Sequence, residues 1–508
     1  MELKLEREHI SGYDMVLNTG MHQEETLETI VPDACPDILR IVDAGGQVCL
    51  SGKNVYDGGL SVSGTVKGWV LYQPEDREDL CRVAVQLPFT AQVEVPGLKG
   101  RGQCVVTPCL RGMDARALNP RKMLVRADIG IVVQAFQPQE HMLCSGITCE
   151  DACAVQQRTR EHMACITAAV EEKEFTFYDE LRLTAGPAGR AEVLCVQAEA
   201  YCTESKVIGS KLLFKGEVAL RIRYQVEGEL CSMRCPMVFS QIMEVAQIGE
   251  EADCDLMMCI TDIEYVPAGE DGRTINVTLE LLGQAVVRDR HHITLLQDMY
   301  STAYSMDVEQ ENYTVHRLLD SAVRSQSVRE LLDTGGAVVK NVVDSTVTVC
   351  QIQQVREDNQ LAITAELRVN LLYMNEQDKI ESISRPITVS GRMDVLRTDV
   401  CLCRCQCPGE VFAVPAAGGV EVRFNVEFHC VIIRPQSVSV VTGASLGEPK
   451  GSRSVGQPSV VLRMAGPGEE LWDVAKACCT TSERIRSANR LEGESLPMGK
   501  MLLIPSVR

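Results

Sequence analysis

Aromatic residues are scarce in this chain of 508 residues: Phe, Trp and Tyr together make up 4% of it, and Trp occurs only twice. Concentrated positive charge is also missing, because the formal net charge is −20. Binding to a phosphate backbone requires clustered Lys and Arg, so the charge balance argues against a nucleic-acid partner. No apolar run approaches the ~18 residues that a transmembrane helix needs. The sequence therefore predicts neither a nucleic-acid-binding protein nor a transmembrane segment.

The N-terminus also lacks the uninterrupted apolar stretch of a secretory signal, because its first ten residues alternate charged and apolar side chains. Cysteine, by contrast, is abundant, with 23 residues, an odd number. Without an export signal, we expect reduced thiols in a cytoplasmic protein. Most of them should act as small buried apolar side chains, filling cores that contain few aromatics.

A nine-residue pattern that ends in Tyr recurs three times. The copies span residues 64–72, 216–224 and 365–373. Each copy is followed by Pro after 16, 12 or 13 residues, at Pro88, Pro236 and Pro386. A variable interval between fixed strands is typical of a hairpin loop, and the alternation of apolar and polar residues predicts half-buried strands. The sequence therefore predicts a mainly β fold with three tandem β-rich domains of similar fold, joined in series.

The boundaries follow from changes in pattern. We expect three β domains at 1–136, 174–300 and 301–442, a helical connector at 137–173, and a flexible Gly/Ser linker at 443–457. The connector is predicted helical because a polar half precedes an apolar half, and a second helix-like pattern occurs at 318–323. The linker holds four Gly and three Ser in 15 residues. We expect it to be mobile, with little contact between the β domains and the last 51 residues.

Residues 458–508 are predicted to form a small α+β module of order βααβ. Strands are expected at 460–464 and 501–504. Leu471, Val474, Ala475 and Cys478 recur at helical spacing, which predicts a first helix over 470–479 with one apolar face. A capping box at 480–483 predicts the start of a second helix. Trp472 is predicted to pack this module, with contact to a partner as the alternative.

The module resembles the LysM family in three blocks that occur in the family's order: 468–476, Asn489 and 496–505. The resemblance implies a groove that binds N-acetylglucosamine polymers such as peptidoglycan. The groove residues would be Gly468, Glu469, Glu470, Leu471, Asn489, Leu491, Pro497 and Met498. An aromatic that the family usually has in the first strand is replaced here by Leu462 or Arg463. The fold is therefore expected to be kept better than glycan binding, with apolar anchors such as Leu491 and Met498 contacting a protein partner.

The tandem β domains resemble the SipL-type spore coat assembly family, or SPOCS domain. The segments that carry this resemblance are 30–41, 64–72, 88–90, 95–97 and 298–304. It implies a non-enzymatic scaffold in the mother-cell cytoplasm, at the outer surface of the forespore and in the spore coat. Its LysM module would engage the ATPase of the coat's basal layer, or other spore coat proteins, and tether the coat. The alternative is a LysM protein that binds peptidoglycan or cortex, with the β domains as spacers.

The sequence shows no catalytic constellation. HExxH is absent, and the GxSxG match at 443–447 runs into a Pro/Gly/Ser-rich segment where a nucleophile elbow needs a helix. We therefore expect no enzyme activity and no cofactor.

Two Cys-rich segments could suggest a metal. Cys401, Cys403, Cys405 and Cys407 alternate along one predicted strand. Same-face neighbours on a strand are about 7 Å apart, too far for one tetrahedral zinc, so we expect reduced, metal-free, buried thiols. The second segment leaves open whether zinc binds at His141, Cys144, Cys149 and Cys153.

Overall fold

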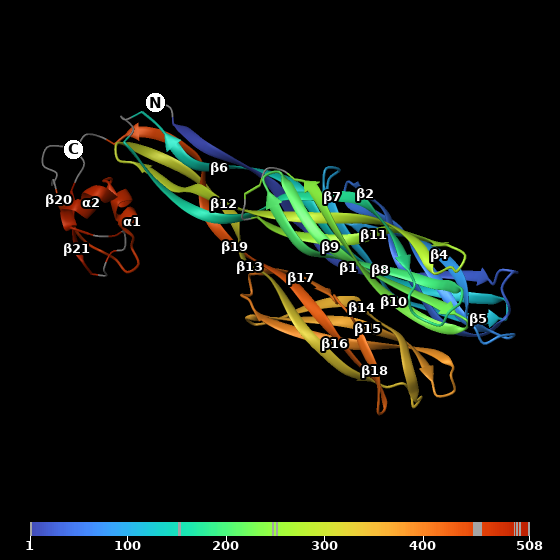
Figure 1. Ribbon diagram of the computed structural model, residues 1–508. Coiled ribbons are helices and arrows are strands. Elements are labelled where there is room, and N and C mark those ends of the chain that lie inside the picture. Colours follow the sequence, from blue (N-terminus) through green and yellow to red (C-terminus); the bar gives the residue numbers. More distant parts are fainter. Residues whose placement is uncertain are drawn as a thin grey trace.

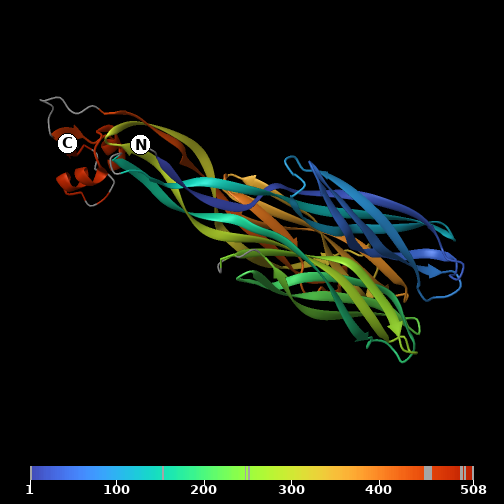
Figure 2. The same cartoon turned by 90° about the horizontal axis from the view of Figure 1, so that it is seen from above.

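The computed structural model describes residues 3–150, 154–245, 248–249, 252–450, 460–491, 493, 496 and 499–505. This part of the chain contains 21 strands and two short helices in an elongated molecule (Figures 1 and 2). None of its helices combines the length and the hydropathy that a membrane span requires. The mainly β fold predicted from the alternating pattern is confirmed.

The first β unit is a two-layer sandwich of six antiparallel strands. They are β1 (Lys4–Ile30), β2 (Ile38–Tyr56), β3 (Gly59–Pro74), β4 (Cys81–Glu94), β5 (Gln103–Asn119) and β6 (Lys122–Thr148). β2, β3 and β4 form one sheet, while β6 pairs with β1 and β5 in the other. Val62, Val66 and Val85 of the first layer share one buried core with Ile129 and Ile131 of the second. Alternate residues of each strand thus face the core, as in other sandwiches.

The second and third units repeat this connectivity. The second contains β7 (Val155–Arg182), β8 (Ala191–Ile208), β9 (Lys211–Val226), β10 (Glu229–Glu244), β11 (Asp253–Ala268) and β12 (Thr274–Ser301). The third contains β13 (Tyr304–Leu332), β14 (Val339–Glu357), β15 (Gln360–Asn375), β16 (Ile380–Asp394), β17 (Val400–Gln406), β18 (Phe412–Ala416) and β19 (Gly419–Pro449). In each unit the second, third and fourth strands form one sheet, and the first strand pairs with the last. The predicted similarity of the three folds is confirmed.

The recurring tyrosines belong to the three cores. Tyr72, Tyr224 and Tyr373 are at most 1% exposed. The hydroxyls of Tyr72 and Tyr224 donate to the carbonyl oxygens of Pro36 and Ala185, both at 3.0 Å. Both carbonyls lie in the connection between the first two strands of their unit, so the tyrosine fastens that connection to the core.

The first residue of the repeated pattern faces a cross-strand partner of complementary size. The pairs are Gly64 with Phe89, Gly216 with Phe239, and Ala365 with Val389. A Cβ on Gly64 would lie 2.4 Å from the ring of Phe89, and one on Gly216 would lie 2.2 Å from the ring of Phe239. In the third unit the smaller Val leaves room for the methyl group of Ala365. The first two cores thus fill this position with a Gly and a large Phe, and the third fills it with the intermediate pair Ala and Val.

The first and last strands of all three units continue beyond the sandwiches into a common stalk (Figures 1 and 2). Its core combines residues of six long strands: Ile10 of β1, Leu143 of β6, Ala164 of β7, Ile293 of β12, Val315 of β13 and Val438 of β19. The units are therefore held together at the stalk, which corrects the expected arrangement of independent domains in series.

The prediction of a helical connector at 137–173 is wrong. Its residues belong to β6, which ends at Thr148, and to β7, which begins at Val155. The helix-like pattern at 318–323 lies in β13. Ala168 in β7 and Leu319 in β13 are bulge residues without a cross-strand partner. Each is one extra residue in its strand, so it interrupts the alternation from which a strand is recognised. The predicted domain boundaries at 136, 174 and 442 consequently cut through long strands.

The predicted linker is wrong in its first half. Residues 443–449 are the end of β19, where Gly443 pairs with Glu309 and Ser445 with Asp307 of β13. Small residues form a strand here because β13 supplies a continuous pairing partner. The GxSxG match thus lies within a strand rather than at a turn. Residues 451–457 lie outside the described part of the chain.

The C-terminal module has the predicted βααβ order. Its elements are β20 (Val460–Met464), α1 (Leu471–Ala477), α2 (Ser482–Asn489) and β21 (Met501–Pro505), with β20 and β21 antiparallel. Leu471, Val474 and Ile485 of the helices bury fully against Leu502 of β21. α2 begins one residue later than predicted, because the hydroxyl of Thr481 caps it by accepting from the backbone N–H of Arg484 (3.2 Å).

Candidate binding site on the C-terminal module

The first wall of the predicted groove is the turn between β20 and α1. Gly468 has φ of +77°, a conformation that Gly adopts without strain. The carboxylate of Glu469 closes the turn by accepting from the backbone N–H of Gly466 (2.9 Å) and from the guanidinium of Arg463. Leu471 is fully buried. The Glu469 carboxylate and the Leu471 side chain therefore both stabilise the fold of the module.

The second wall follows α2. The Asn489 side chain joins α2 to β21, because its Nδ2 donates to the Leu503 carbonyl (2.6 Å) and its Oδ1 accepts from the Leu503 N–H (2.7 Å). Leu491 is partly buried against the module's core. Pro497 and Met498 lie outside the described residues. Asn489 and Leu491 thus hold the fold together, and Leu491 is not an isolated surface anchor.

Glu470, the remaining groove residue, faces the stalk. Its carboxylate forms an ion pair with the guanidinium of Arg158 in β7, and Arg160 lies 3.7 Å away. The backbone N–H of Glu470 donates to the carboxylate of Asp473 (3.3 Å) at the start of α1. This acidic residue therefore fixes the module to the β array rather than facing an open groove.

A second contact with the stalk is centred on Asp298 of β12. Its carboxylate accepts from the indole Nε1 of Trp472 (2.7 Å) and from Nζ of Lys476 (2.7 and 2.8 Å). The backbone N–H of Met299 donates to the same carboxylate (2.8 Å) and fixes its orientation. Trp472, which was predicted to pack the module or to contact a partner, packs the module and contacts β12 at the same time.

Tyr300 makes the third contact between the stalk and the module. We call Arg158, Asp298 and Tyr300 together the seat of the module. The ring of Tyr300 meets that of Trp472 edge to face, with centroids 4.9 Å apart, and its hydroxyl donates to the Thr480 carbonyl (2.8 Å). Burial, with the nearby acidic groups, raises the pKa of Tyr300 to about 12, so the hydroxyl stays protonated. The expectation that the module contacts the array little is wrong, because an array side chain forms part of the module's core.

The face of the two-stranded sheet that points away from the helices is apolar and open to solvent. Its side chains are Val460, Leu462, Met464, Met501 and Leu503, each 43–63% exposed. Leu462 pairs with Leu503 and Met464 with Met501 across the strands. We call these five residues the apolar face. It was missed in the sequence, although β20 and β21 are apolar at almost every position, where a half-buried strand should alternate.

Of the four alternating cysteines, Cys401 is buried in the core of the third unit, as predicted, whereas Cys403, Cys405 and Cys407 are partly buried and pack against that core. Cys403 lies opposite Cys430 of β19. The hydrogen bond with Cys430, together with burial, raises the pKa of Cys403, so this thiol stays protonated.

The second Cys-rich segment is dispersed. The ring of His141 contacts Tyr313 edge to face at 5.2 Å, and Cys144 is buried in the stalk. Cys149 follows the end of β6, and Cys153 is outside the described residues. Within the described ranges, no three His, Cys, Asp or Glu side chains gather in a way that could hold a metal ion.

Two regions of the chain match the family model described as SipL, SPOCS domain, at residues 37–118 and 191–267. They correspond to β2–β5 of the first unit and β8–β11 of the second, without the long strands of the stalk. No curated protein and no solved structure matches the chain. The chain therefore contains two SPOCS-type regions, which are consistent with a role in sporulation.

Proposed function

We propose that this protein, with its SPOCS-type regions, is a non-enzymatic scaffold for assembly of the endospore coat. The β array is the rigid body of the scaffold, and the C-terminal module, which is similar to a LysM domain, tethers the coat's basal layer to the forespore. The protein would act in the mother-cell cytoplasm, at the outer surface of the forespore. The observation that carries this proposal is the apolar face, presented at one end of an elongated array (Figure 1).

The apolar face favours a protein partner. Contiguous exposed apolar side chains are typical of protein interfaces, and the two Met side chains can adapt to an irregular partner surface. Residues 458–508 carry seven basic and six acidic residues, whereas the rest of the chain carries −21. An acidic coat protein, such as the basal-layer ATPase, can therefore approach the module without strong repulsion.

Glycan binding is the weaker proposal. Trp472 is the only aromatic residue in 458–508, and it is 8% exposed beneath Tyr300, so it offers no ring for stacking on a sugar. The side chains of Glu469, Glu470 and Asn489 already bond within the protein. Peptidoglycan would have to be bound by other groups.

The test is localisation of a fluorescent fusion of the full chain in a sporulating host. Replacing Leu462 and Leu503 by Ser removes a cross-strand pair of the apolar face without touching the buried core. Val238→Ser is the matched control, because Val238 of β10 is 76% exposed on the array. We expect a ring around the forespore for the parent and the control, and diffuse fluorescence for the double variant.

Binding measurements with the purified full chain distinguish the alternatives. We expect the basal-layer ATPase to bind the parent and not the Leu462/Leu503 variant, with circular dichroism confirming that both are folded. A ring that persists in the double variant refutes the role of the apolar face. Binding of muropeptides by the parent, with no binding of coat proteins, would replace the scaffold with the peptidoglycan alternative.

A further inference from the structure

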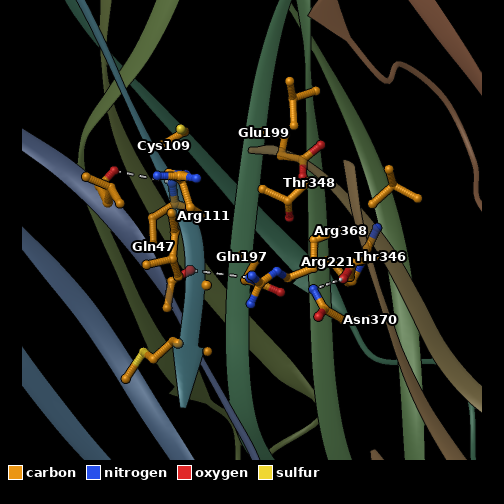
Figure 3. A pocket seen from close by; sticks show the side chains of 18 of the residues that line it. Gln47, Cys109, Arg111, Gln197, Glu199, Arg221, Thr346, Thr348, Arg368 and Asn370 are labelled. Atoms are coloured by element: carbon orange, nitrogen blue, oxygen red, sulfur yellow. Dashed lines mark hydrogen bonds between the residues drawn. The ribbon is translucent and has the colours of Figure 1, made fainter. Parts of the chain in front are cut away.

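A cavity of about 690 Å³ lies where the three β units meet, and no residue of the C-terminal module lines it. Figure 3 shows part of its wall. Its wall combines β2 and β5 of the first unit, β8, β9, β10 and β11 of the second, and β14, β15, β16 and β17 of the third. The volume falls within the range typical of small-molecule sites. A ligand that fills the cavity would contact all three units at once.

Four arginines line this cavity although the chain as a whole is strongly acidic. They are Arg111 of β5, Arg221 of β9, Arg234 of β10 and Arg368 of β15, so every unit contributes at least one. Figure 3 shows Arg111, Arg221 and Arg368 coming from different strands around the space. Convergence of guanidinium groups from three units indicates a site for negative charge.

Arg221 is the most informative of the four. Its side chain is 9% exposed, and its Nε has no hydrogen-bond partner among the described residues. The nearest carboxylate, that of Asp344, is 3.8 Å from Arg221 Nε and also lies 3.5 Å from Arg223. One carboxylate is therefore shared by two buried guanidinium groups. A buried donor without an acceptor is unfavourable, so an anion in the cavity would supply what Arg221 lacks.

The guanidinium of Arg368 packs against the backbone of the first unit at Gly112, where no side chain is in the way. Gly112 follows a β-bulge in β5, and a Cβ there would lie 2.4 Å from Nη1 of Arg368. Arg368 forms no ion pair with any described residue. Arg111, on the same strand as Gly112, lies 3.6 Å from Asp128, and its Nε likewise has no hydrogen-bond partner in the described chain. The wall is thus shaped to bring guanidinium groups from opposite units together.

Two of the three acidic residues of the wall are paired with arginines that lie outside it. Asp43 binds Arg223 (2.7 Å) and Asp114 binds Arg126 (3.2 Å), and neither of those arginines lines the cavity. Glu199 accepts from the hydroxyl of Tyr201. The remaining polar wall includes uncharged side chains: Gln47, Gln197, Thr346, Thr348, Asn370, Ser382, Ser384 and Gln406. The excess charge is therefore positive, and neutral hydrogen-bonding groups surround it.

We propose that this cavity binds a small polyanion that carries carboxylate or phosphate groups and bridges the three β units. Planar guanidinium groups bind both kinds of oxyanion in a bidentate manner. The proposal is independent of the partner of the C-terminal module. Because the bound anion would contact the folded array only, its binding raises the stability of the whole protein.

The test uses the full-length protein with citrate and pyrophosphate as probes, at an ionic strength held constant with NaCl. We expect one or both probes to raise the unfolding temperature with concentration and to bind at one site per chain by calorimetry. Citrate alone would identify a carboxylate site, and pyrophosphate alone a phosphate site. Absence of binding by both probes overturns the proposal.

Variants locate the site. Arg368→Met should weaken binding by about tenfold or more, the loss expected for a charged hydrogen bond. Gly112→Ala displaces the same guanidinium without removing it, and should weaken binding in the same direction. Arg329→Met is the matched control, because Arg329 is exposed on β13. Binding that is unchanged in both Arg368→Met and Gly112→Ala refutes the site, and either variant alone suffices if the other does not fold.

Discussion

Removal of the Asp298 carboxylate should release the C-terminal module from the stalk. In Asp298→Ala, the indole N–H of Trp472, which is 8% exposed, loses its acceptor, at a cost of about 1–3 kcal/mol. Loss of the ion pair with the partly exposed Lys476 adds less than about 1 kcal/mol. The docking equilibrium should therefore weaken by about 1–4 kcal/mol, between about fivefold and several hundredfold.

Tryptophan fluorescence reports this release. The chain has two tryptophans, Trp69 and Trp472, which are 3% and 8% exposed, so exposure of Trp472 should shift the emission to the red. Hydrogen exchange in α1 and at the end of β12 should accelerate together. Asp298→Asn keeps an acceptor for the indole and should have a smaller effect, and Asp307→Ala removes an exposed acid of the following strand, β13, as a control. Unchanged emission and exchange in Asp298→Ala would show that the seat does not hold the module.

Two further predictions concern the β units. Gly216→Ala should destabilise the protein by about 1–3 kcal/mol in urea unfolding, because the new methyl group collides with the ring of Phe239 and with the carbonyl oxygen of Tyr201. Adding Phe239→Val removes the first collision and should recover part of the loss, as the Ala–Val pair of the third unit indicates, and a strictly additive double variant would contradict this explanation. Hydrogen bonds from Arg434 lower the pKa of Asp399 below its usual 3.8, so its contribution to stability is present above that pH and is lost as the pH falls below it. Asp399→Asn should therefore lower the urea midpoint at pH 7 and make less difference at pH 3, and an equal difference at both would refute the assignment.

The sandwich of each unit could be predicted because its determinants are local. Alternation marked the strands, and the recurring Tyr and Pro fixed equivalent positions, so that Pro88, Pro236 and Pro386 all lie in the third strand of a three-stranded sheet. Tyr72 and Tyr224 recur for a physical reason that the sequence does not show: each hydroxyl donates a hydrogen bond to a backbone carbonyl in the connection between the first two strands of its unit.

The stalk could not be predicted, because its pattern is interrupted and its partners are remote. Bulges at Ala168 of β7 and Leu319 of β13 break the alternation, and further bulges interrupt the other four long strands of the stalk. Its core depends on contacts such as Ile10 with residues more than a hundred positions away. Local periodicity contains no information about such contacts, so these segments were assigned to helices, which need only neighbours in the sequence.

The order of the module could be predicted, but the direction of its side chains could not. Leu471 and Asn489 were predicted to line a groove, yet Leu471 is fully buried and the Asn489 side chain joins α2 to β21. Asp298 stood out in the sequence only as part of a family-like segment at 298–304, and nothing there indicates that its carboxylate binds Trp472. The charged cavity was hidden for the same reason, because Arg111, Arg221 and Arg368 are far apart in the chain.

The seat and the stalk together explain how a small module can have a defined orientation on a large array. Arg158 belongs to β7 and Tyr300 to β12, which pair along their whole length, while Lys450, directly after β19, donates to Sγ of Cys479 in the module (3.2 Å). The second and third units therefore both fix the module, and they can do so only because their long strands share one stalk. The contacts of α1 turn the helical side of the module toward the stalk and leave the apolar face of β20 and β21 exposed. A partner bound to that face would be carried in a fixed direction relative to all three β units, as a tether requires.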